Sequence, residues 1–495
     1  MVKLSLFIIH LKESLDAMRH RNLIYRTFAL VLPLLAGFGA HAESGDVFST
    51  LELTSPSVAG NVLPWNEGQE PCSAGHPDGP LALADVVERA LCNNPQTREA
   101  WANARFQAAQ VGIGQSAYYP TLTGTGNVSL NNRDSSARGV SNTFNQQNVG
   151  ISLGYVLYDF GARDANLENA RQVLAAANAT QDATLQLVFL SAVQAYYQLF
   201  AAQAALDAAR EAEKSDQESL SAAAARYQVG VGTPADRLQA QTAYSQAVLI
   251  RVRSEGDLRN ARGVVANVMG LDANTAIEFA LPSAQTPPEH FEDEVARLID
   301  DARKHRPDLE AAEAQIKAAE ASVESAKAAG KPIVTVSTSL QFSDASNTPS
   351  SRDAALGVQV SIPIFTGYEN TYRIRAAREQ VGIKQAQREK LSLQIALDVW
   401  QAYQSLVTET QTVRSSEDLL VSALQSEKVA LGRYKAGVGN ILDVLTAQSA
   451  LASARQQNIQ ALYNWYIAKA SLAQSMGQLD MVSISTPITK TGNQP

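Results

Sequence analysis

The feature that most constrains this chain is a segment that it carries twice. Residues 226–247 read RYQVGVGTPADRLQAQTAYSQA, and residues 433–454 read RYKAGVGNILDVLTAQSALASA. Aligned at a shift of 207 positions without a gap, the two segments are identical at 11 of 22 positions. Solenoid repeats have periods of about 20–50 residues, so a period this long indicates something larger. We therefore expect two copies of one large structural unit.

The composition and motifs argue against nucleic-acid binding and catalysis. The 495 residues carry a net charge of −8, with Lys and Arg scattered among the acids, whereas nucleic-acid binding needs a clustered basic face. There is no HExxH, no GxxxxGK[ST] and no GxGxxG between a strand and a helix. We therefore expect no nucleic-acid partner, no catalytic, metal-binding or cofactor-binding residues, and no enzymatic activity.

The N-terminus has the pattern of an export signal. Arg19, Arg21 and Arg26 precede an apolar run over 28–40, and Ala40-His41-Ala42 forms a small-x-small cleavage site. A permanent membrane-spanning helix needs about 20 apolar residues, and this run is shorter. We expect residues 1–42 to be a signal peptide, with Met18 as an alternative first residue. A retained membrane anchor is the alternative interpretation.

Export makes the two cysteines informative. Cys72 and Cys92 lie 20 positions apart, with no CxxC motif and no histidine beside them. In an oxidising compartment the simplest expectation is one disulfide, which would contribute about 3 kcal/mol. It would fasten an extended, Pro/Gly-rich arm at residues 43–80 to the first helix. Two free buried thiols are the alternative.

The period of the apolar residues follows the same course in each half: helical, then alternating, then helical again. The expected division is a first repeat at 81–270, with strands at about 121–131 and 148–158 and helices at 162–228 and 235–268; a linker at 271–290; a second repeat at 291–477, with strands at about 333–342 and 356–365 and helices at 368–436 and 441–476; and a disordered tail at 478–495. Polar hairpin loops are expected between the strands of each pair.

The four strands have the length and alternation of outer-membrane strands. Leu122, Val128 and Leu130 fall on one side of the first strand, and small polar residues fall on the other. Four strands cannot close a barrel, since bacterial barrels begin at about eight. Each unpaired backbone group at an open edge costs several kcal/mol in hydrocarbon. Three chains would close 12 strands. A soluble β-sandwich with long helices attached is the alternative.

The two longest helices, of about 65 residues, would each extend ~100 Å at 1.5 Å per residue. Their apolar residues recur at alternating steps of three and four, with small residues between large ones, as in a coiled-coil seam. They are too long and too polar to lie in a bilayer, so we expect them to run through water.

This element order, given twice, resembles the TolC family of outer-membrane exit ducts over about residues 80–477. Gly437-Val438-Gly439 followed by Leu442-Asp443-Val444-Leu445 and Gln448 resembles that family's tip motif. The resemblance implies an α+β membrane protein in which three protomers form a 12-stranded barrel continued by a 12-helix periplasmic α-barrel. It implies a passive channel in the outer-membrane lipid of a Gram-negative bacterium, for type I protein secretion or drug efflux.

The same resemblance implies a homotrimer, a periplasmic adaptor and an inner-membrane ABC or proton-driven transporter as partners. The cysteines and Leu91-Cys92-Asn93-Asn94-Pro95 look more like the branch that serves type I secretion of cyclolysin-like toxins. A periplasmic coiled-coil scaffold or adaptor without a pore is the alternative function.

The doubled motif has a local structural explanation. Gly230 and Gly437 suit the positive φ at a helix end, and Thr233 and Asn440 are good N-caps. A well-made helix hairpin and nothing more is therefore one interpretation. The family resemblance implies another, in which Tyr434, Asp443, Tyr227 and Asp236 form the periplasmic gate and the turns dock the adaptor through Gly230, Val231, Gly232, Gly437, Val438 and Gly439.

Two positions depart from the family's tip motif. Gly439 stands where the best-known member has an arginine, and Thr446 where it has a second aspartate. We therefore expect fewer gating bonds and a single acidic ring.

Overall fold

The computed structural model describes residues 46–56, 72, 79–135, 140–282 and 294–481. The chain divides into two units, residues 1–51 and 52–495. In the described part of the first unit, the Asp46 carboxylate accepts hydrogen bonds from the Thr50 hydroxyl (3.0 Å) and the Leu51 N–H (2.7 Å). The expected signal peptide lies outside the described residues, as does the tail from residue 482.

An extended arm was expected at residues 43–80. Its described part instead contains a short 3₁₀ helix, η1 (Thr50–Leu53). Residues 53–56 lie against the 67-residue helix α5 (Ala162–Gln228). Gln181 donates through Nε2 to the Pro56 carbonyl at 2.7 Å, and Asn178 donates through Nδ2 to the Leu53 carbonyl at 3.0 Å. These side-chain bonds, rather than a sheet, hold this segment of the arm.

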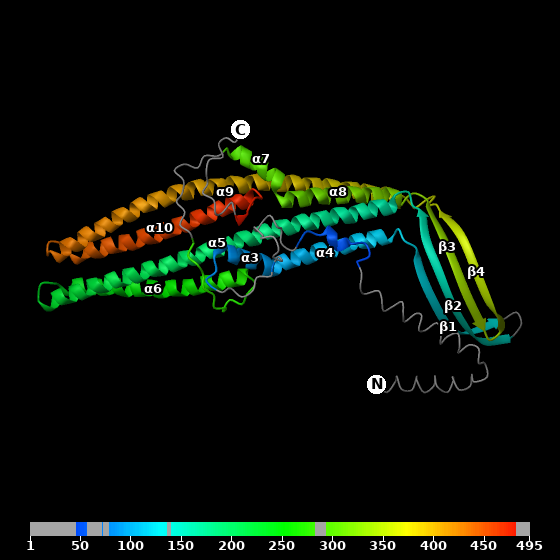
Figure 1. The fold of residues 1–495 in the computed structure, drawn as a ribbon, viewed down its shortest axis with the longest axis horizontal. Helices are drawn as coiled ribbons and strands as arrows, with labels where there is room; N and C mark the ends of the chain where they lie inside the picture. Colours follow the sequence, from blue (N-terminus) through cyan, green and yellow to red (C-terminus); the bar gives the residue numbers. More distant parts are fainter. Residues whose placement is uncertain (1–45, 57–71, 73–78, 136–139, 283–293, 482–495) are drawn as a thin grey trace, which may run out of the picture. The chain divides into compact units, whose positions relative to one another are not determined.

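The helices of the second unit repeat in length as well as in order. Helices of 11, 22, 67 and 35 residues occur in the first half and again in the second. In the first half they are α3 (Leu83–Asn93), α4 (Pro95–Ser116), α5 and α6 (Pro234–Val268); in the second, α7 (Val295–His305), α8 (Pro307–Ala328), α9 (Glu369–Lys435) and α10 (Ile441–Ser475). Figure 1 shows each half as a pair of antiparallel long helices.

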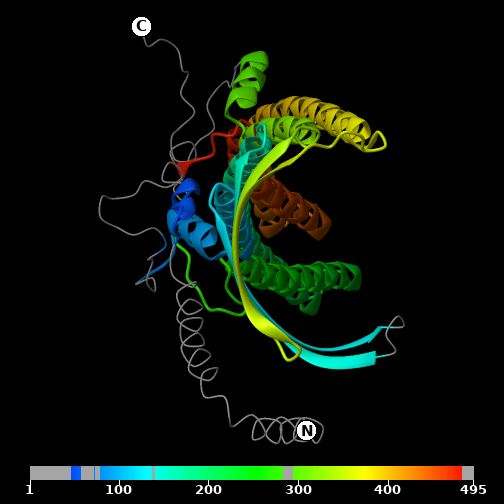
Figure 2. The same cartoon turned by 90° about the vertical axis from the view of Figure 1, so that its right-hand side faces the viewer.

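One four-stranded sheet joins the two halves. Its strands are β1 (Thr121–Ser135), β2 (Val140–Tyr158), β3 (Ile333–Ala345) and β4 (Thr348–Ser361), and they lie in sequence order with every neighbour antiparallel. Figure 2 shows that the sheet is strongly curved. Strands β1 and β4 are its two edges, so each has one side without a partner strand in the single protomer.

The strand ends differ from those predicted. The polar residues beyond the predicted end of the first strand and before the predicted start of the second continue the hydrogen-bonded ladder. The pairing of β1 with β2 therefore extends to Ser135 and Val140, where ends near 131 and 148 had been predicted. Strand β4 begins at Thr348, not at 356, and it ends at Ser361, not at 365. It stops there because Ser361 pairs with Ile333, the first residue of β3, and because Pro363 has no N–H to donate.

The apolar side of the sheet is exposed in the protomer. Leu122, Val128 and Leu356 are 70%, 76% and 79% exposed in the protomer. A single soluble chain would not leave aligned apolar rows in water on four adjacent strands. These rows form a surface suited to hydrocarbon.

The long helices pack along narrow seams around one large apolar core. Trp465 of α10 is among its most buried side chains, and its indole Nε1 donates to the Thr410 hydroxyl of α9 at 3.1 Å. Helix α5 contains an 18-residue window apolar enough to cross a membrane, but 56% of that window is buried inside the protein. This is the pattern of a core helix.

In both halves, residues at the junction of the two short helices contact the C-terminal end of the shorter long helix, α6 or α10. Gly270 ends α6 with φ +73°, and Asn94 donates through Nδ2 to the Val268 carbonyl at 2.9 Å. In the second half, Gly477 ends α10 with φ +73°, and Arg306 donates through Nη1 to the Ser475 carbonyl at 3.5 Å. The repeat therefore extends to the contacts that terminate the helices.

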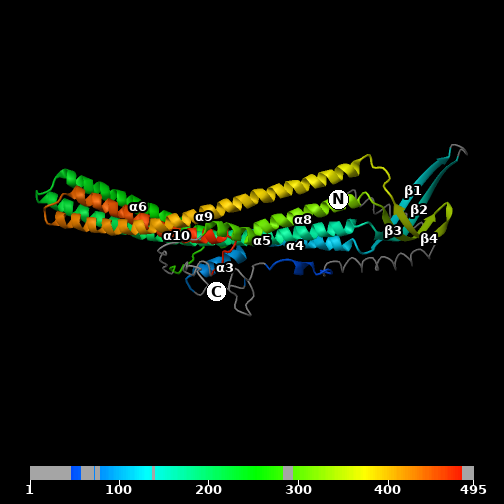
Figure 3. The same ribbon diagram turned by 90° about the horizontal axis from the view of Figure 1, so that it is seen from above.

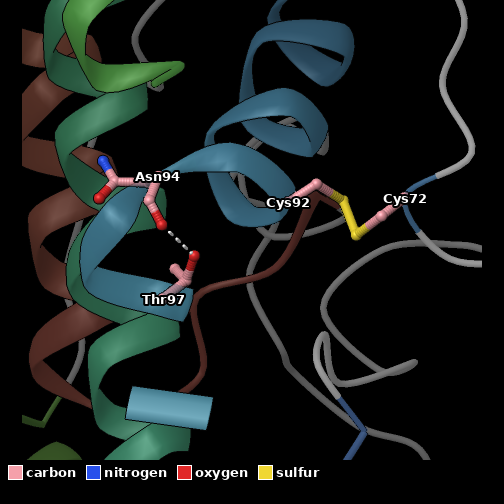
Figure 4. The surroundings of a disulfide bond; sticks show 4 residues. All are labelled: Cys72, Cys92, Asn94 and Thr97. Atoms are coloured by element: carbon pink, nitrogen blue, oxygen red, sulfur yellow. Dashed lines mark hydrogen bonds between the residues drawn. A yellow bond between two sulfur atoms is a disulfide. The ribbon is translucent and has the colours of Figure 1, made fainter. Parts of the chain in front are cut away.

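A disulfide fixes part of the arm at the first of these junctions. Cys72 and Cys92 are bonded, so the alternative of two free thiols does not hold. Figure 4 shows the bond at the end of α3, beside the turn where the Thr97 hydroxyl donates to the Asn94 carbonyl at 2.8 Å. The arm is thus covalently attached next to the contact between α3 and the end of α6.

Asp216 on α5 gives the fold a pH dependence. Burial raises the pKa of its carboxyl group from 3.8 to about 6. Between those values the folded state holds a proton that the unfolded state lacks, so stability falls as pH rises through this window. Two pKa units correspond to about 3 kcal/mol, and solvent screening of this partly exposed group reduces that value. We therefore expect Asp216→Asn to stabilise the protein by on the order of 1 kcal/mol at pH 8 and by much less at pH 4. Thermal unfolding of the purified protein at the two pH values checks this, and destabilisation at pH 8 would contradict it.

Candidate functional site

The doubled motif forms the turns of the two long hairpins. We call residues 226–237 the first tip and residues 433–444 the second tip. Figure 3 shows the two tips side by side, at the end of the helices farthest from the sheet. Each contains a glycine with positive φ, +79° at Gly230 and +77° at Gly437. In each, the N–H of the next residue returns to the carbonyl of the repeated arginine at 3.0 Å. The prediction of helix-terminating glycines is confirmed.

The second glycine of each turn is needed for a different reason. A Cβ at Gly232 would lie 3.1 Å from the Tyr227 backbone nitrogen, and one at Gly439 would lie 3.1 Å from the Tyr434 backbone nitrogen. Each turn therefore passes directly over the helix end that precedes it. Any side chain in place of Gly439 would require this turn to open slightly.

The two aspartates of the tips differ in what they do. Thr233 and Asp236 form a capping box, in which the Asp236 carboxylate accepts the Thr233 N–H at 2.9 Å. In the second tip, the Asn440 Oδ1 accepts the Asp443 N–H at 2.7 Å. The Asp443 carboxylate is exposed and has no hydrogen bond or ion pair with any residue that the structure describes. The N-cap predictions are confirmed. The Asp443 carboxylate, unlike that of Asp236, does not take part in the cap.

The two tyrosines also differ. Tyr434 is 6% exposed and Tyr227 is 38% exposed. Tyr434 packs with Ala223, Ala240, Ile441 and Val444 in an apolar cluster that contains residues from all four long helices. Tyr434 is thus placed where the two tips of one protomer meet, whereas Tyr227 lies at the surface.

Arg226 connects the two tips, and the sequence reasoning did not select it. Its guanidinium Nη1 donates to the Tyr434 carbonyl at 3.0 Å, and its Cζ lies 4.6 Å from the centroid of the Tyr434 ring. The pair adds a charged hydrogen bond to a cation–π contact. The repetition of an Arg-Tyr pair before both turns was the signal that could have identified it.

A buried polar contact continues the seam away from the tips. Gln448 of α10 donates through Nε2 to the Ser215 hydroxyl at 2.7 Å and to the Ser219 hydroxyl at 3.0 Å on α5. These bonds fix the register between the two hairpins. Among the described residues, no group of three or more His, Cys, Asp or Glu side chains could hold a metal ion.

The turns also expose apolar side chains. Val231 and Val438, between the two glycines of each turn, are 68% and 69% exposed. The six predicted docking residues therefore form two equivalent knobs, one at each tip.

Each half of the chain matches a known protein family. The family model described as "Outer membrane efflux protein" matches residues 86–271 and 298–478, one match for each half. Protein CyaE of Bordetella pertussis is 31% identical over 436 residues, which cover 87% of this chain and 91% of that protein. The outer membrane protein TolC of Vibrio cholerae is 22% identical over 80% of this chain and 91% of its own length.

Solved structures show the same fold. The outer-membrane channel OprN superposes with a TM-score of 0.71 at 22% identity, over 80% of this chain and 90% of that one. The open state of the MtrE outer membrane channel of Neisseria gonorrhoeae gives 0.68 at 22% identity, over 80% and 89%.

These matches decide between the interpretations that the sequence left open. The fold is that of trimeric channels with four strands and two long hairpins per chain, so the soluble β-sandwich does not apply. The family match rules out the scaffold without a pore. The function is that of an outer-membrane exit duct in tripartite export, extending into the periplasm. The chain belongs to the outer membrane efflux protein family.

Proposed function

We propose that the two tips form the periplasmic gate of this duct, with Tyr434, Asp443, Tyr227 and Asp236 as its residues. The observation that carries the proposal is the Arg226–Tyr434 contact, which ties the first tip to the second. Three protomers bring six such tips together where the tunnel narrows. The hairpin-only interpretation accounts for the glycines and the caps, but it gives no role to a contact between two hairpins.

Asp443 supplies the charge of this gate. Three symmetry-related copies of an exposed carboxylate form one acidic ring, and Thr446 supplies no second ring. Asp443→Asn is therefore expected to lower the preference for cations over anions, because the ring loses its charge. A single ring should also hold divalent cations weakly. Reversal potentials and Mg²⁺ titration of single channels in planar bilayers test both expectations.

The exposed acid Asp418 on α9 provides the control for this experiment, because it lies outside both tips. Asp418→Asn should leave selectivity near that of the unmodified channel. Tight divalent block of the unmodified channel, or unchanged selectivity in Asp443→Asn, would contradict the single-ring expectation.

We infer that the knobs at Val231 and Val438 dock a periplasmic adaptor, and that an inner-membrane ABC or proton-driven transporter supplies the energy. Family membership supports such partners, and the exposed valines supply an apolar contact surface at the end nearest the inner membrane. Val231→Glu should abolish export while trimers still assemble, because the substitution places a charge in the contact without touching the core. Loss of the trimers instead would favour a purely structural role.

We propose a secreted protein as the cargo. The support is the Cys72–Cys92 bond beside Asn94-Pro95, features that resemble the type I secretion branch of the family. Deletion of the gene, followed by comparison of secreted proteins with drug susceptibility, tests this. Loss of one large secreted protein is expected; broad drug sensitivity with unchanged secretion would assign the duct to efflux.

A further inference from the structure

The two tips repeat each other in sequence, but one contact between them is formed in only one of its two possible copies. Within a protomer, Arg226 of the first tip meets Tyr434 of the second. The repeat equivalents of these residues are Arg433 and Tyr227. Arg433 is exposed, and its side chain has no hydrogen bond or ion pair with any residue in the described part of the chain. Tyr227 is exposed as well. The second copy of the contact is thus unformed in a single protomer.

Cyclic assembly supplies the missing half. The two hairpins have equal helix lengths and equal turn geometry, so three protomers place six nearly equivalent tips around one axis. The second tip of one protomer should therefore lie beside the first tip of the next protomer in the same relative placement as the first and second tips have within one protomer. We propose that Arg433 donates to Tyr227 of the partner subunit and stacks on its ring, forming a between-subunit latch. This rests on the proposed gate at the tips.

The acceptor for this latch is present. The two tyrosine carbonyls have the same backbone partners in their own turns: Tyr434 O accepts from the N–H groups of Ala436 and Gly437, and Tyr227 O accepts from those of Val229 and Gly230. Tyr434 O also accepts the Arg226 Nη1 donor, whereas Tyr227 O has no arginine donor among the described residues. A carbonyl at the end of a long helix, in the same turn geometry as one that already accepts an arginine, suits an arginine from a neighbouring chain.

The two kinds of latch differ in strength. Val444 packs with Tyr434 in the buried cluster, but its repeat equivalent is Arg237, which lies 5.0 Å from the centroid of the Tyr227 ring. The between-subunit ring therefore stays exposed and already carries one cation. Repulsion between Arg237 and Arg433 weakens that latch relative to the buried one. The gate should accordingly part first along the subunit boundaries, where a docked partner reaches the exposed residues.

Cross-linking tests the geometry directly. The sequence has two cysteines and they are bonded to each other, so introduced cysteines are the only free thiols. The double variant Tyr227→Cys with Arg433→Cys, treated as purified trimer with a short bis-maleimide, should give covalent dimers and trimers on a denaturing gel. The matched pair Arg226→Cys with Tyr434→Cys should give only cross-linked monomer. Monomer alone from the first pair would overturn the proposal.

Conductance tests the role of the latch. Arg433→Gln should raise the single-channel conductance of intact trimers severalfold, and Tyr227→Leu added to it should raise it little further, because both remove one contact. Additive effects would show that the two residues act separately and would overturn the pairing. Cross-linked oligomers with unchanged conductance in Arg433→Gln would overturn the gating role alone. If the Tyr227→Cys, Arg433→Cys pair gives no cross-linked oligomers but Arg226→Ala still raises the conductance, the between-subunit latch is wrong. The proposed gate at the tips would then remain supported.

Discussion

Gly270→Ala is expected to cause a severalfold loss of trimer from the outer membrane. Gly270 ends α6 with φ +73°, and the added Cβ would lie 2.5 Å from the Asn93 carbonyl oxygen at the end of α3. Positive φ costs alanine about 1–2 kcal/mol, and forcing a methyl group against fixed backbone costs about 1–3 kcal/mol more. Neither backbone is free to move, because Asn94 bonds to the Val268 carbonyl and Cys92 is in the disulfide.

Gly256→Ala on the same helix is the matched control. A Cβ there meets no atom within 4 Å, so replacing a helical glycine should stabilise α6 by about 1 kcal/mol. Heat-modifiable trimer in isolated outer membranes is the quantity to measure. Equal trimer levels in the two variants would show that the contact between α3 and the end of α6 is not needed for assembly.

Arg226→Ala is expected to open the duct. The substitution removes a charged hydrogen bond, which contributes about 1.5–3 kcal/mol, and a cation–π contact, which adds about 0.5–2 kcal/mol. Both act between the tips of one protomer, and the trimer contains three copies. The cluster that remains beneath Tyr434 is small, so the tips should separate and single-channel conductance should rise severalfold.

Two variants make this result specific. Arg226→Lys keeps the charge but not the planar fork, so its conductance should be intermediate. Arg210→Ala lies on the same helix and removes only an exposed ion pair with Asp207 of its own helix, so its conductance should not change. Unchanged conductance in Arg226→Ala trimers, with the protein intact, would mean that this contact does not hold the tips closed.

The helices could be predicted closely because their signals are local. The period of the apolar residues, the N-caps Thr233 and Asn440, and the terminal glycines fix ends within a residue or so of the observed ones. The strands were harder, because alternation marks only their apolar part. Beyond residue 131 both sides of β1 are polar, the alternation disappears, and the ladder continues to Ser135 through backbone bonds that any side chain permits.

The arrangement of the residues at the tips could be predicted only in part. The repeat identified Tyr227 and Tyr434 as a pair, but their different burial depends on contacts between hairpins about 200 residues apart. One such difference is Val444 against Arg237: the valine packs in the cluster that buries Tyr434, whereas the arginine lies over the exposed Tyr227 ring. Arg226 was missed because the sequence shows the Arg-Tyr pair twice but does not show which of the two arginines contacts the other tip.

The most direct test of closure at the tips is chemical modification of Asp443→Cys in single channels. No other thiol is free in the chain, since Cys72 and Cys92 are bonded. If the tips form the narrowest passage, a bulky thiol reagent should reduce the current in up to three steps, one for each protomer. The same reagent should have little effect on Gly382→Cys, an exposed position on α9 away from the tips. An unchanged current after complete modification of Asp443→Cys would contradict closure at the tips.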